Sequence, residues 1–329
     1  MKFYSLPNEI PENMLQGMAL THPHLTYLDG TGIMYDNQFD QNHVPIISGG
    51  GSGHEPAHVG FVGKGMLAAA VTGSLFVPPK AEYILQTIRQ VNHGKGVFLV
   101  VKNFEADLLV FEEAIKQARA EGIDARYIVS HDDISVNVYN YHKRHRGVAG
   151  TVLLHKILGA MAANGATIDE IQAAAFELSV HIFTLGVALA PVSFPNQKTS
   201  FDLAANEVSF GVGIHGEPGY RIEKFESQER IAIELVNKLK HEIHWRHHEH
   251  FNDFIILVNG LGATTLMELY SFQYDVLRLM ELEGINVVFS KVGNLMTSFD
   301  MEGISLTLCP VRDDKWLTAL QAETSAFGW

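Results

Sequence analysis

The sequence predicts an α/β protein of two domains, each containing a mostly parallel or mixed sheet flanked by helices. Two observations lead to this fold class. Short apolar runs of strand length alternate with segments of helical periodicity along the whole chain, an order that favours sheets covered by helices. With 329 residues, 47% of them hydrophobic and 19% charged, the chain has an ordinary globular composition and exceeds the usual length of one domain.

The domain boundary is predicted from a change in composition. Residues 191–200 contain proline, asparagine and serine and lack helical or strand periodicity, so they form the best linker candidate. We therefore expect a first domain over 1–188 and a second over 189–329. No unit of roughly 20 to 50 residues repeats, which excludes a solenoid.

Turn and cap residues delimit the elements of the first half. The run GVFLVVK at 96–102 is apolar almost throughout and is typical of a buried strand. Pro78 and Pro79 precede a helix predicted over 81–91, since proline suits the first helical turn. Glycines at 122 and 165 end the helices predicted over 108–121 and 148–163. The other predicted elements are strands at 44–48, 66–72 and 125–130 and a helix at 168–180.

The second half repeats the alternation. A strand at 208–214 runs into a glycine-rich loop, and Gly284 closes a long helix predicted over 265–283. The other predicted elements are helices at 228–241 and 315–322 and strands at 254–259, 285–291 and 304–308.

Charge and cysteine content limit the classes of function. The formal charge of −13 argues against direct binding to nucleic acid or to an anionic membrane, so a partner protein must contact DNA if this chain acts in gene control. Cys309 is the single cysteine and cannot form an internal disulfide. The first residues contain no apolar signal segment, and no apolar run approaches the length of a membrane span. We therefore expect a cytoplasmic protein.

The first candidate site is the loop SGGGSGHEP at residues 48–56, directly after a predicted strand. Glycines there allow a sharp turn and bring backbone N–H groups close to a ligand. The loop is not a Walker A motif, because no Gly-Lys-Ser/Thr follows, and Pro56 stands where a dinucleotide fingerprint needs its third glycine. A simple tight turn is the alternative, but His54 and Glu55 at its end favour a small-molecule site.

A second loop of similar composition, GVGIHGEPG, occupies residues 211–219. Both loops follow strands and contain a histidine near a Glu-Pro pair. Because ligands of open α/β sheets bind outside the carboxyl ends of strands, His54 and His215 are predicted to face one cleft. Two unrelated turns with ordinary surface histidines are the alternative.

Lys102 and Asp107 form the third candidate, at the carboxyl end of the strand 96–102. A lysine and a carboxylate at this position can polarise a substrate oxygen and handle its proton. A solvated salt bridge at the start of a helix is the alternative, since an aspartate suits the first helical turn electrostatically.

The histidine-rich run at 241–250 does not predict a metal site. His244 and His248 have helical spacing, but the run lacks the HExxH arrangement of zinc hydrolases. We expect a solvated polar connection between a helix and a strand, and we expect neither a metal nor a cofactor. An apolar stripe on the helix 265–283 is expected to be ordinary helix core; it comprises Leu266, Leu269, Tyr270, Tyr274 and Leu277.

Several segments together resemble the dihydroxyacetone-binding subunit of dihydroxyacetone kinases, in particular the phosphotransferase-dependent type. They are ISGGGSGHEPAH, GMLAAAVTG, VFLVVKNF, HRGVAGTVLLHKILGA, NEVSFGVGIHGEPG, LVNGLGATTLMELY and TSFDMEGISLTL. The resemblance covers nearly the whole chain, and the pair GGGSGHEP and GVGIHGEPG is specific.

The resemblance implies a ligand and roles for individual residues. The ligand is dihydroxyacetone, held as a hemiaminal on His215, with His54 as acid/base and Asp107 against a substrate hydroxyl. An imidazole nitrogen can add to a carbonyl while a nearby acid/base moves the proton, and glycerol, which lacks a carbonyl, is rejected by this chemistry. The resemblance implies further substrate contacts from Lys102, Gly51, Ser52 and Gly53.

The sequence departs from the kinase pattern around these residues. Kinase members of the family usually have hydroxyl residues at Val77 and Pro78, a glycine at Ala106 and an asparagine at Val110. The family also includes paralogues that bind dihydroxyacetone and serve as coactivators of a transcription regulator, and the departures favour that group. A sensor with a regulator partner is therefore the first hypothesis, and the substrate-binding subunit of a kinase, with a nucleotide-bearing partner subunit, is the alternative. By the same resemblance we expect a homodimer.

Overall fold

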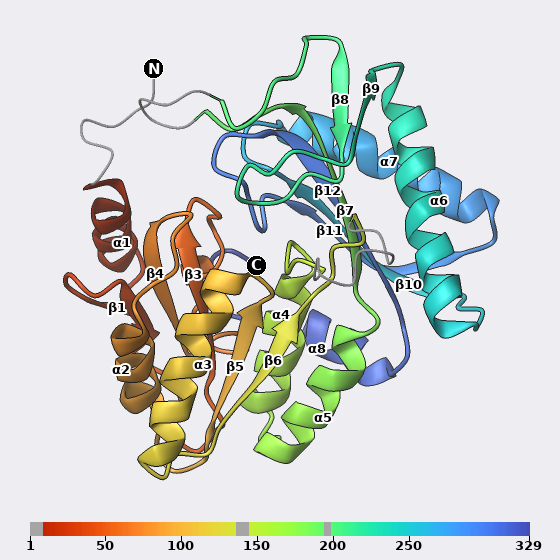
Figure 1. The fold of residues 1–329 in the computed structure, drawn as a ribbon. Helices are drawn as coiled ribbons and strands as arrows, with labels where there is room; N and C mark the ends of the chain where they lie inside the picture. Colours follow the sequence, from red (N-terminus) through yellow and green to blue (C-terminus); the bar gives the residue numbers. More distant parts are fainter. Residues whose placement is uncertain (1–8, 136–144, 194–198) are drawn as a thin grey trace. The chain divides into compact units, whose positions relative to one another are not determined.

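The computed structural model describes residues 9–135, 145–193 and 199–329 (Figure 1). The chain forms two compact units. The first contains the residues up to Ser130, Val152–Glu177 and Thr318–Trp329, and the second contains His131–Thr151 and Leu178–Leu317. The boundary predicted between 188 and 189 falls inside strand β7 (Phe183–Ala190), which belongs to the second unit. Part of the linker candidate, residues 194–198, lies outside the described residues.

The first unit contains, among the described residues, a six-stranded sheet in the order β1-β2-β4-β3-β5-β6. Strands β4, β3, β5 and β6 run parallel to one another, and β1 and β2 are antiparallel to their neighbours. The strands are β1 (Leu25–Leu28), β2 (Ile33–Asp36), β3 (Ile46–Ser52), β4 (Ala69–Leu75), β5 (Val97–Lys102) and β6 (Ala125–Ser130).

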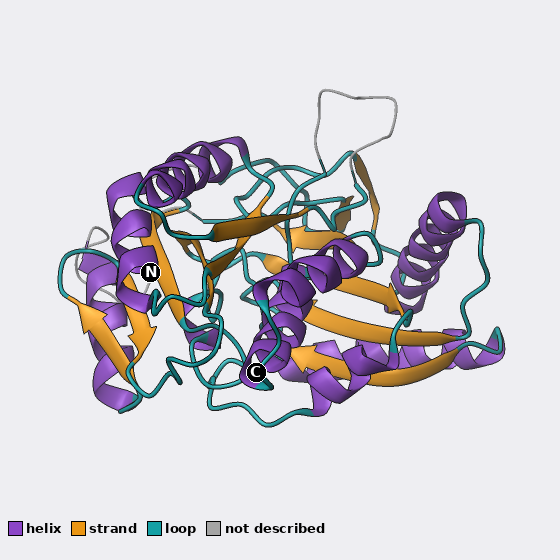
Figure 2. Cartoon of the chain, turned by 90° about the horizontal axis from the view of Figure 1, so that it is seen from below, coloured by secondary structure: helices purple, strands orange, loops and turns teal. Residues whose placement is uncertain are grey.

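Helices flank this sheet (Figures 1 and 2). Two of them, α2 (Ala81–Val91) and α3 (Glu105–Ala120), share a core with the strands, where Ile88 and Phe111 pack with Leu99. A third, α4 (Thr151–Ala163), approaches the backbone so closely that a Cβ on Gly159 would lie 2.4 Å from Met66 Cα. The other elements are α1 (Ile10–Thr21), η2 (Val59–Phe61), α5 (Ile168–Ser179) and α8 (Asp314–Gln321), the last spanning both units.

The second unit contains, in its described part, a six-stranded sheet in the order β11-β10-β12-β7-β8-β9. Its strands are β7, β8 (Glu207–Phe210), β9 (Arg221–Lys224), β10 (Asp253–Gly260), β11 (Asn286–Gly293) and β12 (Glu302–Pro310). Only β10 and β11 are parallel, and the other neighbours are antiparallel. The expected mixed sheet is thus present, but it is mainly antiparallel. The connection from β11 to β12 is too short for the helical crossover that a parallel neighbour requires.

Helices α6 (Gln228–His247) and α7 (Leu266–Leu282) contribute to the core of the second unit. Two expectations about them were wrong. The helix α6 continues to His247, so most of the histidine-rich run is helical and does not form a connection. On α7, Leu269 is buried, but Leu266, Tyr270 and Tyr274 are each more than half exposed, so the predicted stripe is not core.

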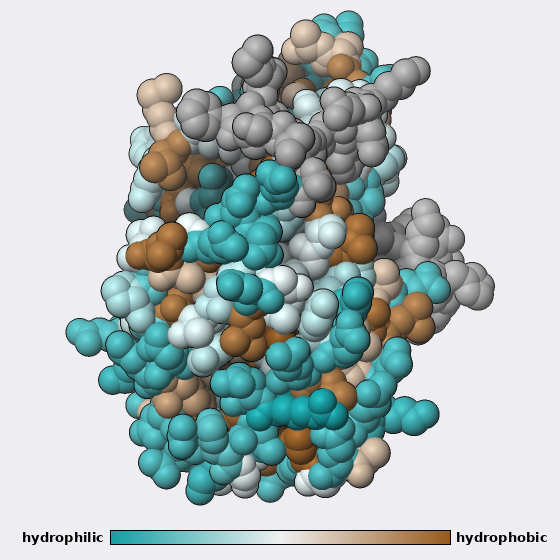
Figure 3. Space-filling view, turned by 90° about the vertical axis from the view of Figure 1, so that its left-hand side faces the viewer, coloured by the Kyte–Doolittle hydropathy of each residue, from teal (hydrophilic) through white to brown (hydrophobic). Residues whose placement is uncertain are grey.

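The surface carries both hydrophilic and apolar side chains (Figure 3). On the face drawn in Figure 3, hydrophilic side chains surround scattered apolar ones, an ordinary distribution for a folded protein. Within the described ranges, no helix is long and apolar enough to cross a membrane.

Candidate functional site

The first glycine-rich loop begins inside β3, where every residue is buried. Gly50 has a φ of 155°, and a Cβ on this residue would lie 2.1 Å from Lys102 Nζ and 3.1 Å from Asp107 Oδ1. A side chain at this position would therefore collide with the lysine-aspartate pair. The glycine brings the backbone of the loop directly against these two charged groups.

The next glycines pack against the segment after β4. A Cβ on Gly51 would lie 2.6 Å from the nitrogen of Val77, and a Cβ on Gly53 would lie 2.6 Å from Phe76 Cε1. The backbone N–H of Phe76 donates to the carbonyl of Ser52 at 2.9 Å. Phe76 itself has a φ of 56°, an uncommon conformation for a bulky residue. The loop and this segment thus form one closely packed wall.

His54 packs against the segment that follows β4. Its side chain is fully buried and stacks on Phe76, with ring centroids 5.1 Å apart and an interplanar angle of 13°. The backbone N–H of Gly53 donates to both carboxylate oxygens of Glu55, at 2.9 and 3.1 Å. Burial raises the pKa of Glu55, although the hydrogen bond from Gly53 opposes this shift. The Glu-Pro pair of the motif therefore holds the backbone on the amino-terminal side of His54.

Lys102 and Asp107 form a buried pair. Lys102 Nζ lies 3.5 Å from Asp107 Oδ1, and the two side chains are 0% and 4% exposed. The alternative reading of a solvated salt bridge is therefore wrong. The helix α3 begins at Glu105 rather than at the predicted 108, so Asp107 lies in its first turn, where the helix dipole favours a carboxylate.

The first unit thus brings together most of the predicted site residues. Strands β3 and β5 are parallel neighbours, with Ser48 opposite Val100. Because their carboxyl ends lie at the same edge of the sheet, the glycine loop after β3 and the lysine at the end of β5 meet there. The residues concerned are Gly51, Ser52, Gly53, His54, Lys102 and Asp107.

His215 belongs to the second unit, in the loop between β8 and β9. The predicted strand 208–214 ends earlier, at Phe210, and the loop joins two antiparallel strands rather than a strand and a helix. The loop is closed by a hydrogen bond of 2.8 Å from the nitrogen of Tyr220 to the carbonyl of Phe210. A Cβ on Gly219 would lie 2.1 Å from that carbonyl oxygen, so glycine is required for this closure.

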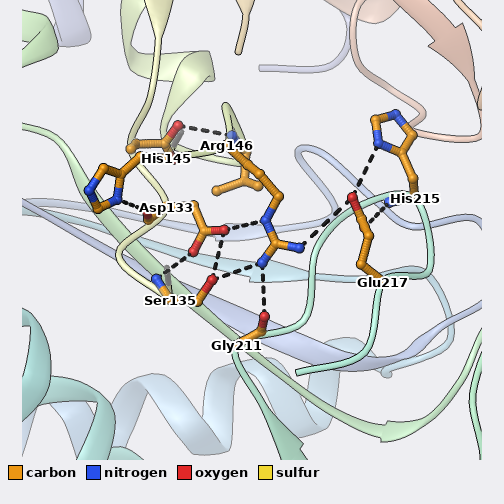
Figure 4. Close-up of polar contacts among 9 residues, drawn as sticks. Asp133, Ser135, His145, Arg146, Gly211, His215 and Glu217 are labelled. Atoms are coloured by element: carbon orange, nitrogen blue, oxygen red, sulfur yellow. Dashed lines mark hydrogen bonds and ion pairs between the residues drawn. The ribbon is translucent and has the colours of Figure 1, made fainter. Parts of the chain in front are cut away.

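Glu217 is the immediate partner of His215 (Figure 4). Its Oε2 accepts the backbone N–H of His215 at 2.8 Å, and its Oε1 lies 3.6 Å from the imidazole Nδ1. Burial raises the pKa of Glu217, but the hydrogen bond with His215 and the charge of Arg146 outweigh this effect and lower the pKa to about 2. The carboxylate is therefore ionised at neutral pH. In neutral His215 it favours the tautomer with the proton on Nδ1 and the lone pair on Nε2.

Arg146 anchors the carboxylate to the rest of the unit (Figure 4). One guanidinium nitrogen lies 3.8 Å from Glu217 Oε1, and Nε donates to Asp133 Oδ2 at 2.6 Å. Another nitrogen donates to Ser135 Oγ at 2.8 Å and to the carbonyl of Gly211 at 2.9 Å. This fork fixes the start of the loop and the carboxylate next to His215 at the same time.

These supporting residues were not predicted. Glu217 had a signal in the sequence, since both loops place a glutamate and a proline after the histidine. Arg146 and Asp133 had none, because their contacts with the loop join segments far apart in the chain.

The structure gives no support for a metal centre in the regions that it covers. Among the described residues, no three His, Cys, Asp or Glu side chains lie close enough together to hold a metal ion. Such a centre requires several converging ligands.

Comparison with known proteins identifies relatives over the full chain. The Dak1 domain matches residues 16–328. The DhaKLM operon coactivator DhaQ of Lactococcus lactis subsp. lactis (strain IL1403) is 72% identical over 329 residues, which are 100% of both chains. The dihydroxyacetone-binding subunit DhaK of the PTS-dependent dihydroxyacetone kinase from the same strain is 42% identical over 330 residues, covering 100% of this chain and 98% of the relative.

Solved structures give the same result. The dihydroxyacetone kinase operon co-activator Dha-DhaQ superposes with a TM-score of 0.95 at 72% identity, over 98% of this chain and 99% of that one. The dihydroxyacetone kinase of C. freundii in complex with AMP-PNP and Mg2+ superposes with a TM-score of 0.89 at 31% identity, and the match covers 98% of this chain and 60% of the kinase. The resemblance recognised in the motifs is confirmed, and the chain belongs to the Dak1 domain family.

Proposed function

We propose that this protein captures dihydroxyacetone as a hemiaminal on His215 and acts as a sensor and coactivator for a transcription regulator. The observation that carries the proposal is the contact of Glu217 with His215. An ionised carboxylate beside Nδ1 leaves the lone pair on Nε2, as addition to a carbonyl requires. The 72% identity with an operon coactivator supports the regulatory part.

The capture step balances without a cofactor. The lone pair of Nε2 forms a bond to the carbonyl carbon, and the π electrons of the C=O bond move to the oxygen. The oxygen takes up a proton, and the imidazole loses the proton of Nδ1, next to Glu217. The products are a neutral imidazole adduct and a hydroxyl group. An acid/base positioned at the oxygen speeds such a proton transfer, and we assign this role to His54.

The buried pair Lys102 and Asp107 is proposed to bind the hydroxyl groups of the ligand. A carboxylate accepts a hydrogen bond from a hydroxyl, and the lysine nitrogen 3.5 Å away can donate one to a hydroxyl oxygen. We expect the backbone of Gly51, Ser52 and Gly53 to supply further contacts, because close glycine packing brings main-chain groups near a ligand.

The positions that differ from kinase members lie around this pair and not within it. Val77 is 54% exposed and Ala106 is exposed, whereas Val110 packs against the core of the first unit. Binding tolerates such changes. Phosphoryl transfer requires the acceptor hydroxyl to lie in line with the donor, and a misplacement of about 1 Å can cost on the order of 100-fold in rate. We therefore favour the sensor over the kinase subunit.

The acidic charge of −13 bears on how a sensor would act. A strongly negative protein is repelled by DNA phosphates, so we expect contact with a DNA-binding regulator rather than with DNA itself. The expected location is the cytoplasm, where both the ligand and the regulator are available.

We also propose that the chain acts as a homodimer. Helix α7 presents large apolar side chains to solvent, and contiguous exposed apolar surface is typical of association sites. Sedimentation of the wild type beside a Met267→Glu/Tyr270→Glu variant tests this. A wild-type monomer would contradict the proposal.

Intact mass spectrometry under mild conditions tests covalent capture. Incubation with dihydroxyacetone should add one triose to the wild type and nothing to His215→Ala. His241→Ala, which changes another histidine of the second unit, serves as the matched control and should behave as the wild type. An adduct that persists in His215→Ala would contradict the assignment of this residue.

A second experiment separates the sensor from the kinase subunit. The purified chain is mixed with dihydroxyacetone and competent nucleotide-bearing kinase subunits, and phosphorylated product is measured. We expect capture with negligible turnover. Turnover of many molecules per second would favour the kinase alternative.

A further inference from the structure

A buried polar cluster of the first unit lies directly behind the Lys102–Asp107 pair. It consists of Ser48, His58 and His155, whose side chains are at most 3% exposed. His58 follows the glycine loop, and His155 lies on α4, a helix that is otherwise mostly apolar. Buried imidazoles carry a large desolvation cost when charged, so two neighbouring ones must have a defined hydrogen-bond arrangement.

The hydroxyl of Ser48 fixes the direction of the hydrogen bonds. Its Oγ donates to the carbonyl of Val100 at 2.7 Å, which uses its only proton. Its lone pairs therefore face His58 Nδ1, 3.3 Å away. A proton on His58 Nδ1 can donate to this oxygen, and it also faces His155 Nε2 at 2.9 Å, which accepts in that arrangement.

The other nitrogen of His58 then accepts from Lys102. Nε2 lies 3.3 Å from Lys102 Nζ. The ammonium has three N–H groups, and its contacts provide three acceptors for them. The other two are the carbonyl of Gly49 at 3.3 Å and Asp107 Oδ1 at 3.5 Å.

We propose that His58 and His155 are positioning residues that hold Lys102 against Asp107 in the ligand site. His155 and Ser48 keep the proton of His58 on Nδ1, and the lone pair on Nε2 then fixes the lysine ammonium. The inference rests on the proposed function, because that function makes Lys102 and Asp107 ligand contacts.

The electrostatics agree with this geometry. Burial lowers the pKa of His58 well below its ordinary value, and the charge of Lys102 lowers it further. Burial and the charge of Lys102 lower the pKa of His155 to about 3. Both imidazoles are therefore neutral when Lys102 is charged, as an acceptor of the ammonium must be.

The first test reads the tautomer without any ligand. Nitrogen-15 chemical shifts of labelled histidine at neutral pH should identify His58 as the Nδ1–H tautomer. A His58 with its proton on Nε2, or a charged His58, would overturn the inference, whatever the protein binds.

The second test measures capture of dihydroxyacetone by variants of His58. His58→Leu removes the acceptor of Lys102 and should weaken capture by about 10-fold or more, since a buried charge loses a partner. His58→Gln, whose side-chain oxygen can replace Nε2, should recover capture to within about 3-fold of the wild type. His181→Leu, a change at a buried histidine of the second unit, is the control and should leave capture unchanged.

The two tests separate the inference from the proposed function. Wild-type protein that captures no ligand would contradict the function, and the tautomer measurement would still decide the inference. Capture equal in the wild type and in His58→Leu would contradict the inference alone. If the leucine variant fails to fold, capture by the glutamine variant and the nitrogen-15 measurement of the His58 tautomer still test the inference.

Discussion

The carboxylate of Glu217 contacts His215 at two places, accepting its backbone N–H at 2.8 Å and lying 3.6 Å from its imidazole Nδ1. One side chain thus fixes both the loop backbone and the ring. The first loop contains a related device, in which Glu55 accepts the backbone N–H of Gly53. In both loops the carboxylate closes on a backbone N–H two residues earlier. The glutamate of the Glu-Pro pair therefore stabilises the loop backbone in each motif.

Replacing Glu217 with glutamine should separate these two functions. The amide oxygen can still accept the backbone N–H of His215, but the negative charge next to Nδ1 is lost. Loss of a charge partner of this kind should reduce the rate of dihydroxyacetone capture by roughly 10- to 100-fold, measured by time-resolved intact mass. Glu223→Gln, at a half-exposed position of β9, is the matched control. Equal rates for the wild type and Glu217→Gln would mean that the carboxylate only shapes the loop.

His54 should affect the rate of capture more than its final extent. The variant His54→Asn keeps a hydrogen-bonding side chain of similar size but cannot shuttle a proton. If His54 acts as acid/base, adduct formation should slow by roughly 100-fold or more. The time course of adduct formation in this variant gives the answer, with Phe76→Leu as a control for loss of the stacked ring. Unchanged kinetics in His54→Asn would assign to His54 a packing role alone.

Local signals predicted the elements with clear boundaries. The helix α2 and the strand β6 have the predicted bounds, because prolines precede the first and a short run containing Tyr, Ile and Val defines the second. The start of α3 at Glu105 was missed by one turn, since acidic residues there lack an apolar periodicity. The end of α6 was missed because histidine-rich sequence does not distinguish a helix from a solvated loop.

Other elements depend on partners that the sequence does not specify. Three strands, the hairpin strands β1 and β2 and the strand β9, have only four residues each. Such strands are too short for their hydrophobic pattern to be recognised in the sequence. No strand was predicted over the residues of β7, and the domain boundary was placed within them. In the structure β7 lies between β12 and β8 in the second sheet. The same holds for the candidate site, where long-range partners could not be predicted from local sequence. Motifs predicted the loop residues, whereas Arg146 reaches Gly211 across 65 positions and is set by tertiary packing alone.

Arg146 should contribute substantially to the stability of the second unit. Its side chain is 15% exposed and forms the fork that joins Asp133, Ser135 and the loop. Arg146→Met would leave Asp133, which is 2% exposed, without its cation, and such losses typically cost about 3 to 5 kcal/mol. Arg146→Lys keeps the charge but cannot make the fork, so a smaller loss of about 2 kcal/mol is expected. Urea denaturation of the three proteins measures both values, and a wild-type midpoint for Arg146→Met would refute this role.

The buried histidines should make the protein less stable in mild acid. The pKa of His155 is about 3 in the folded state and about 6.5 in the unfolded chain. Between these values the unfolded state binds more protons, so the free energy of unfolding falls as the pH falls. The loss begins below about pH 6.5 and amounts to about 1.4 kcal/mol per pH unit for one such histidine until the folded-state pKa is approached.

A variant at position 155 isolates this contribution from those of the carboxylates. Urea denaturation between about pH 6 and pH 5 should give a slope for His155→Gln that is smaller than the wild-type slope by about 1 kcal/mol per pH unit. The Glu217 carboxylate does not interfere in this range, because its stabilisation is fully present above its unfolded pKa near 4.5 and is lost only toward about pH 2. His241→Gln, at an exposed position of α6, should keep the wild-type slope. A wild-type slope in His155→Gln would show that His155 is protonated to the same degree in the folded and unfolded states, contrary to its burial beside Lys102.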